Sequence, residues 1–259
     1  MGKIPVGVEL YSVKDALSKD LEGTLTAIKN YGYEVVEFAG NPQYDAQRTA
    51  KALKDIGLKC SSWHVPFDSL SDDKIDSTIE FHAAVGNQFL IVPWIPHEQM
   101  QDLESLKKLC EKLDKISEKL KKNNMFTGYH NHSDEFQTIK GGNSSVWSAL
   151  RENTNKDFVM QIDTGNALKG DAKLNEEIAA AAGRSQIIHL KPYSLTNGYA
   201  TMIGDADDII DYKFIFDFAK TKGDTKYFIV EYECIEKYGE LEGVKLCIDA
   251  IRAKFDNLL

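Results

Sequence analysis

Two histidines stand close together at the end of one apolar run of the sequence. His130 and His132 lie in the stretch FTGYHNHSDEF, residues 126–136, with one asparagine between them and two acidic residues shortly after. Imidazole nitrogens bind divalent metals and transfer protons near neutral pH. Residues two apart on a strand point to the same side, so one histidine could bind a metal while the other meets a substrate. A loop in which both are simply solvated is the alternative.

Polar residues of similar kinds interrupt the other apolar runs, and they do so at the carboxyl end of each run. They are Glu9, Glu37, His64, His130 with His132, Asp163, His189 with Lys191, and Glu231 with Glu233. Random placement would often bury such a group in mid-strand, where it costs free energy unless it finds a partner. The amino-terminal ends of the runs are much poorer in such groups. The coincidence predicts one shared site.

Four of these residues would form a compact set of metal ligands, namely His130, Asp163, His189 and Glu231. Two imidazoles and two carboxylates suit Mn²⁺, Zn²⁺, Co²⁺ or Mg²⁺, and the lack of cysteine argues against a structural zinc site. Taken singly, a histidine at a strand end is more often a hydrogen-bonded structural residue. Asp163, in DTGNAL, could equally be an ordinary helix N-cap. The prediction of a metal depends on the four together.

Other polar residues are candidates for contact with a substrate. Lys191 follows His189 by two residues and so points to the same side of the strand. It could therefore reach the same pocket and neutralise an enolate or a phosphate. A surface lysine is the alternative. His64 and Glu37 are more distant candidates for binding substrate hydroxyl groups. Glu135 could orient a histidine or donate a proton, or lie in solvent.

Aromatic residues near the same strand ends could supply a flat apolar wall for a sugar ring, although packing is their commoner role. They are Tyr11, Trp63 and Trp94. His82, in a helical segment, and His97, in a loop, are expected to be structural.

The elements that would position these residues alternate along the whole chain. The apolar, strand-length runs are 5–10, 33–39, 58–65, 87–94, 125–132, 157–164, 185–192 and 226–233. Segments of helical period lie between them, among them 21–32, 103–122, 212–223 and 241–255. Eight such alternations predict an α/β fold, a (β/α)8 TIM barrel in a single domain over residues 1–259, with its site at the carboxyl ends of the strands. A doubly wound open sheet is the alternative, but residues 5–20 lack its glycine-rich phosphate loop.

Composition narrows the function classes. The 259 residues are 42% hydrophobic and 27% charged, which is ordinary for a globular protein. A net charge of −9 without a basic cluster argues against a nucleic-acid partner. The four cysteines are far apart, the N-terminus lacks the apolar core of a signal peptide, and no segment suits a membrane span. We therefore expect a cytoplasmic protein with reduced thiols and no membrane partner. A homo-oligomer is left open.

Seven short motifs, taken in order, resemble those of the xylose isomerase-like TIM barrel superfamily, in its sugar phosphate isomerase/epimerase group. They are VELYSV, VVEFAG, WHVPF, GYHNHSDEF, DTGNAL, HLKP and FIVEYE. YHNH, DTG and HLK are specific in combination and weak separately. The resemblance spans nearly the whole chain and implies one divalent metal, often Mn²⁺, held by side chains from strands five to eight. The matching positions are His130, Asp163, His189 and Glu231.

The sequence departs from the family's epimerases at one of these positions. Those enzymes usually carry glutamate where this chain has His130, a change shared by the YHNH subgroup. Two carboxylates on opposite faces of a substrate permit epimerisation, whereas an imidazole that ligates a metal has no lone pair left to act as a base. This leaves Glu231 as the general base, with His132, Lys191 or Glu135 as acid partners. One base and a separate acid suit aldose–ketose isomerisation or β-elimination better than epimerisation.

The sequence therefore predicts a divalent-metal-dependent isomerase or epimerase-like enzyme for a small sugar or sugar derivative. It would abstract a proton next to a carbonyl and pass through a metal-stabilised enediolate. The alternatives are a lyase or dehydratase acting on a keto-inositol or 3-keto-glycoside, and a non-catalytic sugar-binding barrel. An abasic-site endonuclease would need further ligands and a basic groove. The identity of the substrate and its phosphorylation are left open.

Overall fold

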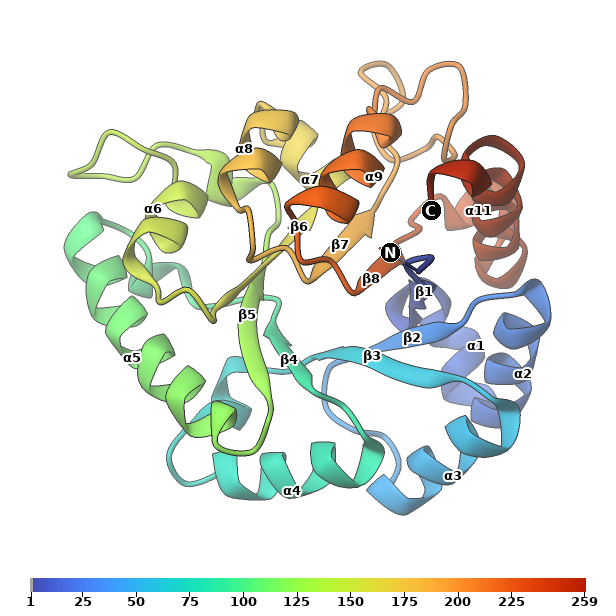
Figure 1. The fold of residues 1–259 in the computed structure, drawn as a ribbon, viewed down its shortest axis with the longest axis horizontal. Coiled ribbons are helices and arrows are strands. Elements are labelled where there is room, and N and C mark those ends of the chain that lie inside the picture. Colours follow the sequence, from blue (N-terminus) through green and yellow to red (C-terminus); the bar gives the residue numbers. More distant parts are fainter. Residues whose placement is uncertain (1) are drawn as a thin grey trace.

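The computed structural model describes residues 2–259, in which eight parallel strands close into one barrel (Figure 1). The strands are β1 (Val6–Glu9), β2 (Val35–Ala39), β3 (Lys59–His64), β4 (Phe89–Val92), β5 (Phe126–His130), β6 (Val159–Asp163), β7 (Ile187–Leu190) and β8 (Tyr227–Val230). They pair in chain order, and β8 returns to β1 with Val6 opposite Phe228. The predicted TIM barrel is confirmed. Each strand lies inside its predicted run, which overshoots it by up to three residues at an end.

Helices follow the strands and form the outer layer of the barrel (Figure 1). They are α1 (Lys14–Lys19), α2 (Leu21–Tyr31), α3 (Ala46–Ile56), α4 (Ile75–Val85), α5 (Leu103–Lys121), α6 (Val146–Asn153), α7 (Thr164–Lys169), α8 (Leu174–Ala180), α9 (Tyr212–Thr221), α10 (Ile235–Tyr238) and α11 (Glu240–Phe255). Short 3-10 helices lie in the connections at Leu10–Val13, Phe67–Leu70, His97–Gln99 and Asp134–Phe136, and another at the C-terminus, Asp256–Leu258.

Local sequence signals begin and end these helices. Asp20 caps α2 by accepting a hydrogen bond from the Gly23 amide, and Gly32 ends it with a left-handed φ of 100°. Asp102 caps α5 in the same way through the Ser105 amide. The leucines of α5 at three- and four-residue spacing are buried from Leu106 onward, as the pattern predicts, whereas Leu103 at the start of the helix is half-buried.

The inward-facing residues of the strands form two layers of different character. The lower layer is an apolar cluster inside the barrel that consists of Val35, Phe89, Ile91, Val159, Ile187 and Ile229. Two positions further along the same strands, or directly after them, the side chains turn polar: Glu37, Gln161, His189 and Glu231. Residues two apart share a face of a strand, so these groups also point into the barrel. The apolar layer closes the floor beneath a polar layer.

No helix within residues 2–259 combines the length and the apolar character that crossing a membrane requires.

Candidate functional site

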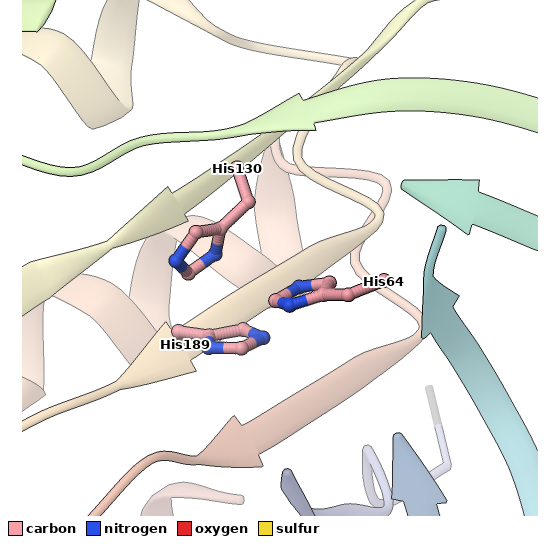
Figure 2. A group of neighbouring side chains, drawn as sticks. All are labelled: His64, His130 and His189. Carbon is pink, nitrogen blue, oxygen red and sulfur yellow. The ribbon is translucent and has the colours of Figure 1, made fainter. Parts of the chain in front are cut away.

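Four side chains from the last strands converge at the carboxyl end of the barrel. His130 ends β5, Asp163 ends β6, His189 lies in β7, and Glu231 directly follows β8. One nitrogen or oxygen atom from each lies within 4.8 Å of the corresponding atoms of the other three, and all four side chains are buried. Figure 2 shows the imidazole rings of His130 and His189 turned toward each other, with His64 beside them. The structure thus brings together the four residues that the sequence predicts as ligands.

The amide of Gln161 fixes the orientation of His130. Gln161 Oε1 accepts a hydrogen bond from His130 Nδ1 at 3.0 Å, so the Nδ1 atom carries the proton. Burial, with His64 and His189 nearby, lowers the pKa of His130 well below its usual value, so the ring is neutral. Its Nε2 atom is then free of a proton and lies 3.8 Å from Glu231 Oε2. A neutral imidazole with a free lone pair aimed at carboxylates is the form that binds a metal.

His189 is held between two carboxylates. Its Nε2 donates to Glu37 Oε1 at 2.6 Å, and its Nδ1 donates to Glu231 Oε2 at 2.8 Å. Burial lowers the pKa of His189, but Glu37 and Glu231 outweigh it and raise the pKa to about 10. A carboxylate that holds the far nitrogen of a histidine is the usual support of a metal ligand. To ligate through Nδ1, the ring has to release one proton.

Asp163 supplies the clearest sign that the cluster suits a cation. Its Oδ1 accepts from the Asn166 amide at 2.6 Å, so it is indeed an N-cap, that of α7. Its Oδ2 is buried and has no hydrogen-bond partner among residues 2–259. Burial, with Glu231 nearby, raises the pKa of Asp163 well above its usual value. A buried oxygen without a partner costs free energy, which a cation at this place would offset. Capping and ligation use different oxygens, so the residues fit a divalent metal.

Lys191 lies inside the barrel, so the alternative of a surface lysine is wrong. It is 1% exposed, and its Nζ donates to Glu231 Oε1 at 2.8 Å, Glu233 Oε1 at 2.6 Å and Asn166 Oδ1 at 3.1 Å. The Tyr199 ring lies against the same ammonium group, 4.1 Å from Nζ to the centroid. Burial lowers the pKa of Lys191, but Glu231 and the other carboxylates outweigh it and hold the pKa well above its usual value. The ammonium group is therefore already neutralised by the protein's own carboxylates.

Glu37 lies beneath the cluster and has no exposed surface. Besides His189, it accepts from Gln161 Nε2 at 2.7 Å, from His64 Nε2 at 3.0 Å and from Ser62 Oγ. Burial raises the pKa of Glu37, but His64 and His189 outweigh it and hold the pKa well below its usual value. These contacts differ from those expected of a residue that binds substrate hydroxyls, because neither oxygen faces the solvent.

The two residues after β5 that were expected to act near the substrate differ in exposure. His132 lies beyond the end of the strand and is exposed, with its ring centroid 5.3 Å from that of His130. Glu135 is buried, and its oxygens accept from Tyr129 Oη and from the His132 amide, each at 2.8 Å. The solvent alternative for Glu135 is therefore wrong. Glu135 instead fixes the backbone that carries His132.

The aromatic candidates also separate into two kinds. Trp63 is buried, stacks on Phe38 and donates from Nε1 to Gly40 O at 2.8 Å, so it is a packing residue. Trp94 is 62% exposed and Tyr11 is 53% exposed, and both line hollows at this end of the barrel.

A cavity of about 420 Å³ opens over the cluster. Its lining contains Glu9, Tyr11, His64, His130, His132, Glu231 and Glu233, with Ala39, Gly40 and Pro93. Within residues 2–259, neither lysine nor arginine is among these lining residues. The walls of the cavity are therefore acidic and rich in imidazole, and its volume can hold a small molecule.

Sequence reasoning missed Gln161, and it placed Glu9 at the shared site without giving it an individual role. Gln161 joins His64, His130 and Glu37 through one side-chain amide. The signal for it was present, because Gln161 precedes Asp163 by two and so shares its face of β6. Glu9 accepts from His64 Nδ1 at 3.0 Å, while its Oε2 has no partner within residues 2–259. Burial, with Glu231 nearby, raises the pKa of Glu9.

Comparisons with known proteins agree with this architecture. The sequence model of a family described as the xylose isomerase-like TIM barrel matches residues 25–254. No curated protein sequence matches the chain significantly. Among solved structures, a sugar phosphate isomerase/epimerase from Parabacteroides distasonis is similar with a TM-score of 0.82 and 22% identity, covering 98% of this chain and 96% of that one.

Two further structures are similar at lower identity. An L-ribulose 3-epimerase has a TM-score of 0.73 and 16% identity, covering 99% of this chain and 96% of that one. A probable 3-DHS dehydratase from Bacillus anthracis has a TM-score of 0.67 and 14% identity, covering 97% of this chain and 100% of that one. At these identities the likeness supports the fold alone, and the chemistry has to be argued from the site.

Proposed function

This chain belongs to the xylose isomerase-like TIM barrel family, and we propose that it is a divalent-metal-dependent enzyme acting on a small sugar or sugar derivative. It removes a proton from the carbon next to a carbonyl group and returns the proton elsewhere, as an isomerase does. The observation that carries this proposal is the convergence of His130, Asp163, His189 and Glu231 within 4.8 Å, with Asp163 Oδ2 unpartnered within residues 2–259.

The four residues would hold one divalent ion, for which Mn²⁺ is our first choice, with Zn²⁺, Co²⁺ and Mg²⁺ as alternatives. A bound ion of this kind polarises a carbonyl group and stabilises the negative charge that appears when the neighbouring proton leaves. The donor set of imidazoles and carboxylates, without a thiolate, supports this choice of metals.

Glu231 is the general base in this proposal. Burial raises its pKa, but the Lys191 ammonium and the hydrogen bond from His189 outweigh burial and hold the pKa well below the usual value. The carboxylate is therefore ionised at neutral pH and faces the cavity. Lys191, which donates to Glu231 Oε1, keeps the base oriented and balances its charge before and after proton transfer.

His132 is the acid partner that this arrangement favours. It is exposed, it lines the cavity, and its backbone is fixed by Glu135. Glu135 is then a positioning residue, because both of its oxygens are engaged away from the cavity. Glu37 has the same kind of role toward His189 and His64.

The site gives little support to epimerisation, which would need a second base on the opposite face of the substrate. His130 uses Nδ1 to bond Gln161 and presents Nε2 to the cluster, so neither nitrogen is left as a base once a metal is bound. One base with a separate acid suits isomerisation. It suits equally the β-elimination of a leaving group from a keto-sugar, which is our second candidate function.

The charge of the cavity favours a substrate without a phosphate group. Three glutamates line it, and the lysine beside the cluster, Lys191, already contacts two carboxylates. A phosphate dianion would bring further negative charge into this acidic space, with little to compensate for it. We therefore propose a neutral sugar or keto-sugar as the substrate.

Hydrogen exchange with solvent tests the proposal directly. The purified protein is supplied with Mn²⁺ in D₂O and incubated with free aldoses and ketoses, inosose and 3-keto-glycosides, and deuterium incorporation is followed by NMR. We expect incorporation next to the carbonyl of at least one class, and its loss in Glu231→Gln. A protein that binds no divalent metal, or that is metal-loaded and exchanges no proton in any class, would exclude this function and leave a non-catalytic barrel.

A further inference from the structure

A second hollow, which we call the annexe, adjoins the cavity over the metal-capable cluster. It has a volume of about 530 Å³, and its apolar walls are Pro66, Phe67, Pro93, Trp94 and Pro96. The annexe shares three lining residues with the cavity, namely Gly40, His64 and Pro93. The two hollows therefore adjoin each other along these three residues.

The annexe is apolar where the cavity is acidic. Trp94 presents 62% of its surface to solvent there, although a large aromatic side chain usually gains free energy by burial. The other two tryptophans of the chain, Trp63 and Trp147, are buried at 3% and 0% exposure. An exposed indole in a concave site is typical of a surface that binds a flat apolar ligand group.

Proline restricts the backbone around the annexe. Three of the six prolines in the chain line it, and a proline ring fixes the backbone angle φ. Pro66 and Pro96 each precede a short 3-10 helix, at Phe67–Leu70 and His97–Gln99. A preformed apolar pocket loses little conformational entropy on binding, so its contacts translate efficiently into affinity.

The polar residues of the annexe give little support to an anionic occupant. Lys112 Nζ lies over the Phe67 ring, 4.6 Å from its centroid, and Asp68 is a neighbouring carboxylate that pairs with Lys74. One lysine beside an aspartate does not provide the concentrated positive charge that a phosphate group requires. The walls therefore favour a neutral apolar group.

His64 connects the annexe to the reactive end of the barrel. Its ring centroid lies 4.6 Å from that of His130 and 5.4 Å from that of His189. A molecule with one end over the cluster can therefore continue past His64 and along Pro93 into the annexe. Its polar end would meet carboxylates and imidazoles, and its other end would meet Trp94 and Phe67.

We propose that the annexe binds a planar apolar substituent of the substrate, such as the aryl group of a 3-keto-glycoside, while the sugar ring with its carbonyl lies over the cluster. This inference rests on the proposed function, because the sugar ring is what the cluster is proposed to hold. The substrate class is then a sugar carrying an apolar group rather than a free sugar.

Equilibrium binding tests the annexe without requiring turnover. The Mn²⁺-supplemented protein is titrated calorimetrically with phenyl β-D-glucopyranoside and with methyl β-D-glucopyranoside, which differ only in the substituent. We expect the phenyl glycoside to bind tighter by about tenfold or more, because only its substituent can cover Trp94 and Phe67. Trp94→Ala should remove most of this advantage, and Trp94→Phe should keep part of it. Leu195→Ala, which truncates a side chain 80% exposed and outside the annexe lining, should keep all of it.

Three results would each overturn the proposal. They are equal affinity for the two glycosides, failure of the phenyl glycoside to bind at millimolar concentration, and an unchanged phenyl advantage in Trp94→Ala. The test is separate from that of the proposed function. If the phenyl glycoside binds tighter but no deuterium is exchanged, the annexe proposal stands and the proposed function is excluded. If deuterium is exchanged but the two glycosides bind equally, the proposed function stands and the annexe proposal is excluded.

Discussion

Replacing Gln161 by leucine should weaken metal binding from outside the ligand set. Leucine is similar in size to glutamine but offers no hydrogen bond. The change removes the contacts of Gln161 with His130 Nδ1 at 3.0 Å, with His64 Nε2 at 2.7 Å and with Glu37 Oε2 at 2.7 Å. His130 then loses the group that keeps the proton on Nδ1 and the lone pair on Nε2 facing the cluster.

The expected magnitudes follow from these contacts. Loss of a group that orients a metal-binding histidine typically costs about 10- to 100-fold in affinity, or about 1.4 to 2.7 kcal/mol. Each buried partner left without a hydrogen bond costs about 1–3 kcal/mol in folding stability. Because the leucine recovers some apolar packing and the contacts are not additive, we expect a stability loss of about 3 kcal/mol.

The assay compares the affinity for Mn²⁺, measured by calorimetry, with the free energy of unfolding measured in urea. Thr127→Val is the matched control. Thr127 is fully buried in β5, the strand that carries His130, and its Oγ1 donates to Leu90 O at 2.8 Å, away from the cluster. The control should lose about 1 kcal/mol of stability and bind Mn²⁺ as the wild type does. The reasoning is refuted if Gln161→Leu lowers stability but leaves the dissociation constant within about twofold of wild type.

Three further outcomes are expected. Glu231→Gln should slow deuterium exchange by roughly 10²- to 10⁴-fold while sugar affinity, measured by calorimetry, changes much less; a wild-type exchange rate would remove Glu231 as the base. Chelation with EDTA should lower the melting temperature, and Mn²⁺ at about 100 times its dissociation constant should restore about 2.7 kcal/mol; calorimetric scans that overlay with and without metal would contradict this. Burial lowers the pKa of His82 to about 4. On acidification from pH 7 to pH 5, the unfolded chain therefore takes up a proton at His82 that the folded chain does not. This difference lowers the free energy of unfolding by about 2 kcal/mol. Urea titrations of His82→Gln should lose correspondingly less stability over this window, and an equal loss in both proteins would show that His82 does not contribute.

The order of the strands and helices followed from the sequence because each element carries its own pattern. The leucine spacing of α5 and the glycine after α2 are local signals, and eight repeats of them leave few folds other than the barrel. The ends of the strands were less well predicted. Tyr227–Val230 pairs in the barrel as β8, whereas the apolar run continues to residue 233. Of the three extra residues, Glu231 and Glu233 both contact Lys191 at the site, whereas Tyr232 is buried in the hydrophobic core.

The sequence by itself determined which residues come together at the carboxyl end of the barrel. His130, Asp163, His189 and Glu231 could be identified because strand ends of a closed parallel barrel must meet, whatever the intervening loops do. What those side chains contact was decided only by the tertiary structure. Gln161 supports His130, and Glu37 supports His189 from below rather than facing the cavity.

Two further features also depend on the tertiary structure. They are the hollow in front of Trp94 and the position of Lys191 between Glu231 and Glu233. The physical reason is the range of the interactions. A helix or strand pattern depends on neighbours a few residues away, whereas Gln161 and Glu37 are 124 residues apart and meet only when the barrel has closed in one register.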